Sequence, residues 1–136
     1  MGTQANTVTS SICKGLRERD FMPTILVEKQ GHTTIFTINK PDRMNAIDST
    51  DAAELEAGLA EFQADADQYV AVLTAAGDKA FCAGADLKAM ATNVADGSYL
   101  PINPSPDIAG IAACEKVTIA AINGLAVGTG TELAIS

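Results

Sequence analysis

The chain has 136 residues, of which 47% are hydrophobic, and its 17 acidic and 9 basic side chains give a formal net charge of −8. The length suits about one domain, and the hydrophobic content suffices for a packed core, which excludes an intrinsically disordered chain. The acidic balance excludes non-specific binding to nucleic acids, because such binding depends on basic patches over phosphates. No apolar run reaches the ~18 residues that a membrane span needs. We therefore expect neither a nucleic acid nor a membrane as a partner.

The cysteines form no recognisable metal or disulfide pattern. Cys13, Cys82 and Cys114 are odd in number, no CxxC spacing occurs, and His32 is the single histidine. Such a set provides neither a zinc site nor a disulfide framework. We expect no metal, reduced cysteines and a cytoplasmic location.

Residues 1–21 differ from the rest of the chain. They are polar, rich in Ser and Thr, and without hydrophobic periodicity, whereas residues 22–30 (MPTILVEKQ) look like a natural start. We expect residues 1–21 to be a disordered leader or a mis-called start, with Met22 as the functional start. A transit peptide is the alternative, because basic residues of this segment precede most of the acidic ones. Residues 22–136 then form the domain.

Strands and helices alternate along that domain. The sequence predicts a hairpin over 24–30 and 33–39, a loop over 40–48 and then a helix, a buried strand over 69–76, a strand-to-helix junction over 80–90, a mobile loop over 92–106, a short helix over 107–114, a strand over 116–123, and a turn leading into a helix over 124–136. This order favours an α/β fold with parallel pairing of strands.

The first and last helices have distinct signals. Asp48 or Ser49 can cap the first helix, in which Leu55, Leu59 and Phe62 fall at i, i+4 and i+7 and form one buried stripe. The last helix starts an apolar face and reaches the end of the sequence with no terminal Gly or Pro. We therefore expect the domain to be incomplete.

Two glycine-containing junctions lead from a strand into a helix. The first backbone N–H groups of a helix have no partner within it and lie at the positive end of its dipole. Two such ends aimed at one point suit an oxyanion hole, and the small residues Ala83, Gly84, Gly128 and Gly130 would give a ligand access to them. The alternative is that the glycines serve tight packing. Neither a GxGxxG nor a Walker pattern is present.

Glu132 adds a side chain with possible chemistry to the second junction. It lies three residues after Thr129, on the same helical face, so a ligand held by a backbone donor at Thr129 would also meet Glu132. A carboxyl group kept dry by apolar neighbours is a candidate general acid or base. We expect four such neighbours, Leu125, Val127, Leu133 and Ile135. The alternative is that Glu132 only complements the helix dipole.

Four motifs together resemble one family. AFCAGADLKAM (80–90) and NGLAVGTGTELA (123–134) look like the two signature segments of the crotonase superfamily, the enoyl-CoA hydratase/isomerase family. NKPDRMNAID (39–48) and KVTIAAING (116–124) resemble its loop and strand. The resemblance implies a crotonase-like ββα spiral, truncated before the C-terminal helical region, that binds an acyl-CoA thioester. It also implies a homotrimer or hexamer, and no cofactor, because coenzyme A is part of the substrate.

The resemblance also assigns roles to residues. It makes the N–H groups of Ala85 and Thr129 the donors that hold a thioester enolate, and it makes Glu132 one of two carboxylates that add water to a 2-enoyl-CoA. The residues it places along the substrate are Arg43, Met44, Ala46, Ala83, Ala85, Asp86, Leu87, Gly128 and Thr129. It implies a hydratase; the alternatives are an isomerase, another crotonase-type enzyme, or a non-catalytic truncated fragment. Thr129 departs from the Gly usual there, and a positive φ would be costly for Thr.

Overall fold

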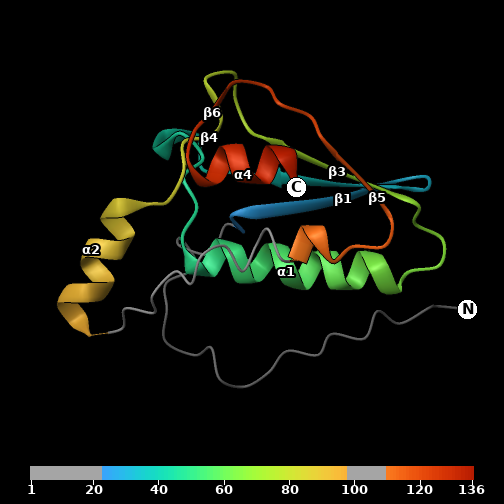
Figure 1. Cartoon of the computed structure of the whole chain (residues 1–136), viewed down its shortest axis with the longest axis horizontal. Helices are drawn as coiled ribbons and strands as arrows, with labels where there is room; N and C mark the ends of the chain where they lie inside the picture. The colour runs from blue at the N-terminus through green and yellow to red at the C-terminus, as the bar shows by residue number, and fades with distance from the viewer. Residues whose placement is uncertain (1–22, 98–109) are drawn as a thin grey trace, which may run out of the picture.

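The computed structural model describes residues 23–97 and 110–136 (Figure 1). The predictions for residues 1–21 and Met22, and those parts of the predicted loop and short helix that fall between 98 and 109, lie outside the described residues. Residues 110–112 are helical, within the range predicted for the short helix. Within the described ranges, no helix has the length and hydrophobicity to cross a bilayer.

A four-stranded sheet in the order β1-β2-β3-β5 forms the base of the fold. The predicted hairpin is confirmed, since its strands are antiparallel and Gln30 pairs with Thr33 across the turn. The other neighbours in the sheet are parallel, as the alternation of strands and helices predicts. The bounds are β1 (Ile25–Gln30), β2 (Thr33–Ile38), β3 (Val70–Ala75) and β5 (Val117–Ala120).

A second, two-stranded sheet joins the two glycine junctions. β4 (Ala80–Cys82) pairs in parallel with β6 (Leu125–Ala126), and the N–H of Val127 donates to the carbonyl of Cys82 at 3.0 Å. The sequence indicates only a turn at residues 124–128, because two residues are too few for a recognisable β pattern. This unforeseen strand places the start of the last helix beside the end of β4.

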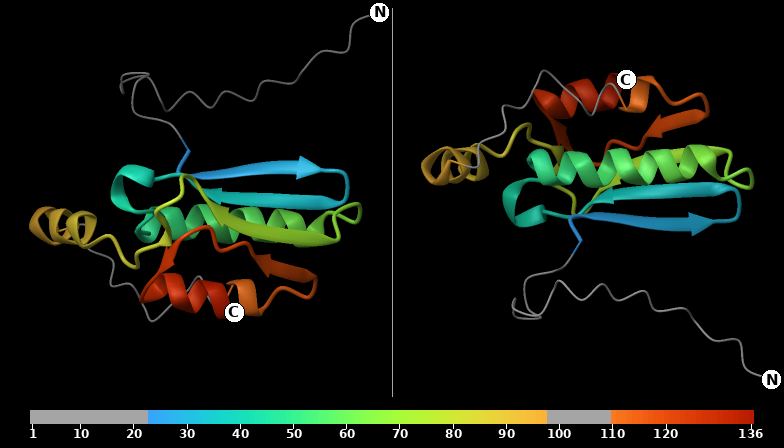
Figure 2. Two further views of the ribbon diagram at one scale, coloured as in Figure 1. Left: turned by 90° about the horizontal axis from the view of Figure 1, so that it is seen from above. Right: turned by 90° about the horizontal axis from the view of Figure 1, so that it is seen from below.

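The helices are the short 3₁₀ helix η1 (Pro41–Arg43), α1 (Ser49–Ala64), α2 (Leu87–Asp96) and α4 (Thr129–Ile135). Asp48 is the N-cap of α1, and it forms a capping box with Asp51. The loop predicted over 92–106 is wrong for residues 92–96, which continue α2. No Pro or Gly interrupts that stretch, and the helix ends at Gly97, whose φ of 77° suits a glycine C-cap. Figure 2 shows α2 projecting from one end of the molecule.

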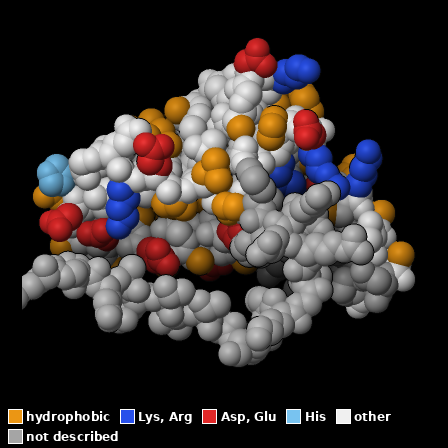
Figure 3. All heavy atoms as spheres, turned by 180° about the vertical axis from the view of Figure 1, so that it is seen from behind, with side chains coloured by type: hydrophobic (Ala, Val, Ile, Leu, Met, Phe, Trp, Pro, Cys, Tyr) orange, Lys and Arg blue, Asp and Glu red, His pale blue; other side chains and the backbone are white. Residues whose placement is uncertain are grey.

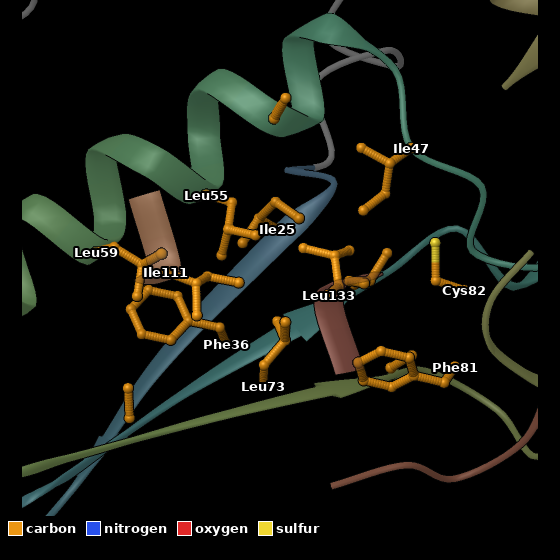
Figure 4. Packing of buried hydrophobic residues seen from close by; sticks show 14 of the residues in the cluster. Ile25, Phe36, Ile47, Leu55, Leu59, Leu73, Phe81, Cys82, Ile111 and Leu133 are labelled. Atoms are coloured by element: carbon orange, nitrogen blue, oxygen red, sulfur yellow. The ribbon is translucent and has the colours of Figure 1, made fainter. Parts of the chain in front are cut away.

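The hydrophobic core lies between the sheet and the helices. The predicted stripe of Leu55, Leu59 and Phe62 is buried, and Phe62 meets Phe36 of β2 edge to face with ring centroids 6.5 Å apart. Leu133 of α4 reaches the same core, as Figure 4 shows. α1 and α4 are therefore held by one common set of apolar contacts.

The strand predicted to be buried over 69–76 is buried on one face only. Ala71, Leu73 and Ala75 point into the core, and the residues between them are half-buried. Hydrophobic side chains also reach the surface at several places (Figure 3). Those of β5 and the following segment that are exposed include Val117, Ile119, Ile122, Leu125 and Val127.

Two of the junction glycines serve packing, which corrects the prediction that Gly130 gives a ligand access. A Cβ on Gly130 would collide with the carbonyl oxygen of Cys82 and would lie 2.8 Å from its carbonyl carbon. A Cβ on Gly124 would lie 2.6 Å from the carbonyl carbon of Lys79. The absence of side chains at these two positions lets α4 and β6 approach the backbone of β4.

We predict that Gly130→Ala destabilises the protein. In a helix, alanine is normally more stable than glycine by about 0.5–1 kcal/mol. Here the collision with Cys82 should reverse the sign and cost about 1–3 kcal/mol, as overpacking does. Urea unfolding of the variant measures the difference.

The matched control is Gly110→Ala. Gly110 is also helical, but among the described residues its added Cβ would meet only Cγ of Glu56, at 3.8 Å. It should leave stability unchanged or raise it. A Gly130→Ala variant at least as stable as the wild type would contradict the packing role of Gly130.

Candidate active site

The loop between β2 and α1 has an unusual backbone held by a buried amide. Met44 and Asn45 both adopt a left-handed conformation, with φ of 53° and 54°. The amide of Asn45 donates to the carbonyls of Ala76 (2.9 Å) and Ala80 (2.7 Å) and accepts from the N–H of Lys40 (3.0 Å). Asn tolerates this conformation better than most residues. Its side chain ties the loop to the end of β3 and the start of β4.

Gly84 redirects the backbone that follows β4. The N–H groups of Ala83 and Asp86 donate to the loop, at Met44 and Ile47. Donors on one side of a regular strand are two residues apart, because side chains and N–H groups alternate. Here they are three apart, since Gly84 has a φ of 102°.

This change frees the N–H of Ala85. Ile47 donates to the carbonyl of Gly84 (2.9 Å) and accepts from the N–H of Asp86 (2.8 Å), so it engages both neighbours of Ala85 in a parallel bridge. Such a bridge leaves the N–H of Ala85 directed away from the loop. No residue in the described ranges accepts a hydrogen bond from it.

The second glycine-containing junction, where β6 leads into α4, lies on the side of Gly84 that faces away from the loop. A Cβ on Gly84 would lie 3.1 Å from the carbonyl oxygen of Val127 and 3.8 Å from the nitrogen of Thr129. Thr129 is the first residue of α4, and within the described part of the chain its N–H also has no acceptor. The positive φ, 55°, belongs to Gly128, so Thr129 avoids the strain considered for it. Gly84 is thus followed directly by one such N–H group, that of Ala85, and lies beside the other, that of Thr129.

Charged side chains surround the start of α2. Asp86 caps this helix by accepting from the N–H groups of Lys88 and Ala89, and it accepts from Arg43 at 2.7 Å. Lys40 lies between three carboxylates, with its Nζ 2.6 Å from Asp51, 3.1 Å from Asp48 and 3.6 Å from Asp86.

These contacts set the protonation states. Burial acts to raise the pKa of Asp86, but the hydrogen bonds from Arg43 and the N–H of Ala89 outweigh it and hold that pKa below its usual value. Burial likewise opposes the charge on Lys40, yet its contacts with Asp51 and Asp48 raise its pKa. Burial raises the pKa of the Cys82 thiol, so Cys82 is not an activated nucleophile.

A surface hollow of about 320 Å³ gathers most of the residues predicted to line the substrate path. Arg43 and Leu87 are among its exposed side chains, and Lys88 adds a second basic group that the sequence prediction missed. The hollow is lined by Asp42, Arg43, Met44, Ala46, Ala83, Ala85, Asp86, Leu87 and Lys88. Gly128, Thr129 and Glu132 do not line it; the first two lie beside Gly84 instead.

Glu132 lies in the first turn of α4 but is exposed to solvent. Three of the four neighbours predicted to keep it dry are exposed as well: Leu125, Val127 and Ile135. The predicted dry setting is therefore wrong for the described residues. Leu133 is buried, but it points into the core.

A second cavity, of about 240 Å³, lies between α1, α4 and the sheet and opens to the surface at the exposed residues Ile119 and Ile135. Residues such as Phe36, Leu55 and Leu133 line it, and it has no charged side chain among its lining residues. It offers no group for acid–base chemistry, so the candidate site is the Ala85 hollow and the adjoining start of α4.

Two residues that organise this site were missed by sequence reasoning. Asn45 could have been found, since an Asn in a polar loop is a common carrier of a positive φ. Lys40 had no such local signal, because its partners are 8, 11 and 46 residues away and only the fold brings them together.

The comparison with known proteins identifies the family. The sequence model of the enoyl-CoA hydratase/isomerase family matches residues 28–136, which is most of the chain. The chain belongs to this family. The family acts on acyl-CoA thioesters, and its crotonase fold agrees with the predicted α/β class.

Relatives of this enoyl-CoA hydratase/isomerase family member are similar over about half of their own length. A probable enoyl-CoA hydratase of Mycobacterium tuberculosis is 39% identical over 113 residues, 82% of this chain and 44% of the relative. The (E)-benzylidenesuccinyl-CoA hydratase of Thauera aromatica is 40% identical, over 85% of this chain and 44% of the relative. The crystal structure of a carnitinyl-CoA hydratase from Mycobacterium avium matches with a TM-score of 0.69 and 38% identity, over 83% of this chain and 43% of that one.

We predict that stability falls at acid pH through the Asp86 cluster. The pKa values of Asp86 and Asp48 lie below the ordinary 3.8 in the folded state, so the unfolded state binds more protons as the pH falls. Their contribution is present above about pH 4 and is lost as the pH falls through the folded pKa values. The free energy of unfolding, measured by urea at several pH values, should show this loss.

Asp86→Asn should lower stability at pH 7 and flatten the decline between about pH 5 and pH 2. The exposed Asp78, which has no side-chain partner in the described ranges, provides the control Asp78→Asn, with a wild-type profile expected. An Asp86→Asn profile parallel to the wild type at all pH values would contradict the role of the cluster.

Proposed function

We propose that the native protein is an enoyl-CoA hydratase that adds water to a 2-enoyl-CoA thioester, or removes it. The observation that carries the proposal is a pair of N–H groups that have no acceptor among the described residues: that of Ala85, which follows Gly84, and that of Thr129, which lies beside Gly84. Preorganised donors of this kind stabilise negative charge that develops on an oxygen atom. The thioester oxygen is the atom we assign to them.

The proposed mechanism is the addition of water to the carbon–carbon double bond through an enolate. The oxygen of water adds to the β-carbon of the enoyl group, and the electron pair of the double bond moves onto the thioester oxygen. The resulting enolate is held by Ala85 and Thr129, and the α-carbon then takes a proton. We assign to Glu132, which lies one helical turn beyond Thr129, the removal of a proton from the water as its oxygen adds. The protonated carboxyl group then supplies the proton that the α-carbon takes, so the elements of one water molecule are added.

The hollow beside Ala85 supports the binding part of the proposal. Its two basic side chains, Arg43 and Lys88, suit the phosphates of coenzyme A, and Met44, Ala46 and Leu87 provide apolar contact. With coenzyme A bound in this hollow, the N–H groups of Ala85 and Thr129 would donate hydrogen bonds to the thioester oxygen. No separate cofactor enters this scheme. We further propose a homotrimer or hexamer for the native protein, in which the exposed hydrophobic side chains become interface.

The names of several relatives support a hydratase. The short-chain-enoyl-CoA hydratase of Clostridium acetobutylicum is 35% identical over 82% of this chain. The acyl groups in the names of the relatives differ, so these names do not indicate which acyl chain this protein binds. A thioester hydrolase is the second candidate, because the 3-hydroxyisobutyryl-CoA hydrolase of Rattus norvegicus is 30% identical over a similar span.

We predict that Thr129→Pro lowers hydratase turnover of the native-length protein about 10²- to 10³-fold, the usual effect of losing one oxyanion donor. Proline is well tolerated at the first position of a helix, where it deletes only an N–H without an intrahelical partner. Steady-state kinetics with a 2-enoyl-CoA, together with urea unfolding, measure both effects. Thr129→Ala keeps the N–H and should retain turnover. If Thr129→Pro were as active as Thr129→Ala, the Thr129 donor would be ruled out.

We predict that Glu132→Gln lowers turnover about 10²- to 10⁴-fold, because it removes an acid–base group, and leaves the affinity for the CoA thioester within a few fold. Kinetics and calorimetric binding separate the two quantities. The exposed Glu56 on α1 provides the control Glu56→Gln. Near-normal hydration by Glu132→Gln would refute the role of Glu132. Product analysis then distinguishes the candidates, since a hydrolase releases free coenzyme A and a hydratase does not.

A further inference from the structure

Lys40 is a buried cation that the proposed mechanism does not use. Its side chain is only 11% exposed, and two of its carboxylate partners, Asp51 and Asp86, are 1% and 4% exposed. A buried charge persists only where its partners compensate it closely. Lys40 does not line the hollow beside Ala85, so it is not placed to contact a ligand there.

The three carboxylates around Lys40 belong to the starts of two helices. Asp48 caps α1, and Asp51 completes that capping box. Asp86 caps α2 and directly follows Ala85 in the chain. One ammonium group therefore links the start of α1 to the start of α2, and Ile47 and Ala85, which form the parallel bridge, lie immediately before them.

The backbone of Lys40 holds the same loop from the other end. Its carbonyl accepts from the N–H groups of Arg43 and Asn45, each at 2.9 Å, and its N–H donates to the amide oxygen of Asn45 at 3.0 Å. Asn45 in turn donates to Ala80, at the start of β4. Both ends of the segment from Ala80 to Asp86 are thus connected to Lys40.

Charge gives Lys40 a second effect on the same donor. The carboxylate of Asp86 belongs to the residue next to Ala85, so an uncompensated negative charge there would oppose an enolate held by the Ala85 N–H. Lys40 and Arg43 both neutralise Asp86. Arg43 is 52% exposed and lines the hollow, whereas Lys40 acts from the buried side.

We infer that Lys40 is a positioning residue for the oxyanion donor of Ala85: it fixes the Gly84–Asp86 segment through Asp86 and through the loop, and it compensates the charge of Asp86. The inference rests on the proposed function. It predicts that Lys40 affects kcat, through stabilisation of the transition state. It predicts no effect of Lys40 on the binding of the CoA part of the substrate.

The kinetic test uses Lys40→Met and Lys40→Arg in the native-length protein. A displaced donor should lower kcat of Lys40→Met about 10- to 100-fold, with KM and the dissociation constant of coenzyme A within about threefold. Lys40→Arg keeps the charge and should restore most of kcat. The control is Lys29→Met, which removes an exposed ion pair with Asp65 and should leave both constants unchanged. An unchanged kcat, or a rise confined to KM, would overturn the inference.

Lys40→Met leaves the buried carboxylate of Asp51 without a cationic partner and could therefore prevent folding, so a second variant covers that case. Lys40→Met/Asp51→Asn removes that charge together with its partner, and its reference is Asp51→Asn alone. Relative to this reference, kcat should again fall about tenfold or more. Equal kcat values for the double and single variants would overturn the inference.

A readout that does not depend on turnover separates the inference from the proposed function. The backbone amide signals of Ala85 and Asp86 in nitrogen-15 NMR spectra should shift or broaden in the Lys40 variants and not in Lys29→Met. A wild-type protein that hydrates no 2-enoyl-CoA would refute the proposed function, and the amide signals would still decide the placement of Ala85. An active wild type with unchanged amide signals and kcat in Lys40→Met would refute the role of Lys40 alone.

Discussion

The arrangement of this site depends on the two hydrogen bonds of Ile47 to the residues on either side of Ala85. Because these bonds use the carbonyl of Gly84 and the N–H of Asp86, the N–H of Ala85 is left without an acceptor among the described residues. Gly84 makes this possible, since its φ of 102° would strain any other residue. The pairing of β4 with β6 then brings Thr129 to the same segment. Two short pieces of backbone thus form the candidate oxyanion site, which uses N–H groups and no side chain.

The features that could be predicted from the sequence are those with a local physical signal. The α1 stripe of Leu55, Leu59 and Phe62 follows from helical periodicity, and the hairpin follows from two β-rich runs around a glycine. β6 could not be predicted, because Leu125 and Ala126 become a strand only by pairing with β4. The packing role of Gly130 could not be predicted either, since the collision that forbids a side chain is with Cys82, 48 residues earlier.

Some of the site residues could likewise be predicted from the sequence, whereas others could not. The resemblance to the family selected residues of the loop and the first junction, and the structure brings Arg43, Ala83 and Asp86 around one hollow. It could not select Lys40, whose three carboxylate partners lie 8, 11 and 46 residues further along the chain. A buried ion cluster of this kind costs desolvation and is a weak source of net stability. The value that we infer for it here is geometric, because a lysine between three carboxylates has few other positions in which all of them remain compensated.

Glu132 and the oxyanion donors place different demands on their surroundings. The donors of Ala85 and Thr129 are backbone groups, and the strand pairing and the loop that orient them lie within the described residues. A carboxylate acts as an efficient acid or base when its surroundings tune its proton affinity, and Glu132 is exposed in the described part of the chain. In the proposed mechanism, the polarisation of the thioester therefore depends only on groups that lie within the described residues. In the proposed mechanism, efficient proton transfer requires Glu132 to be enclosed by the substrate, by other parts of the protein, or by another copy.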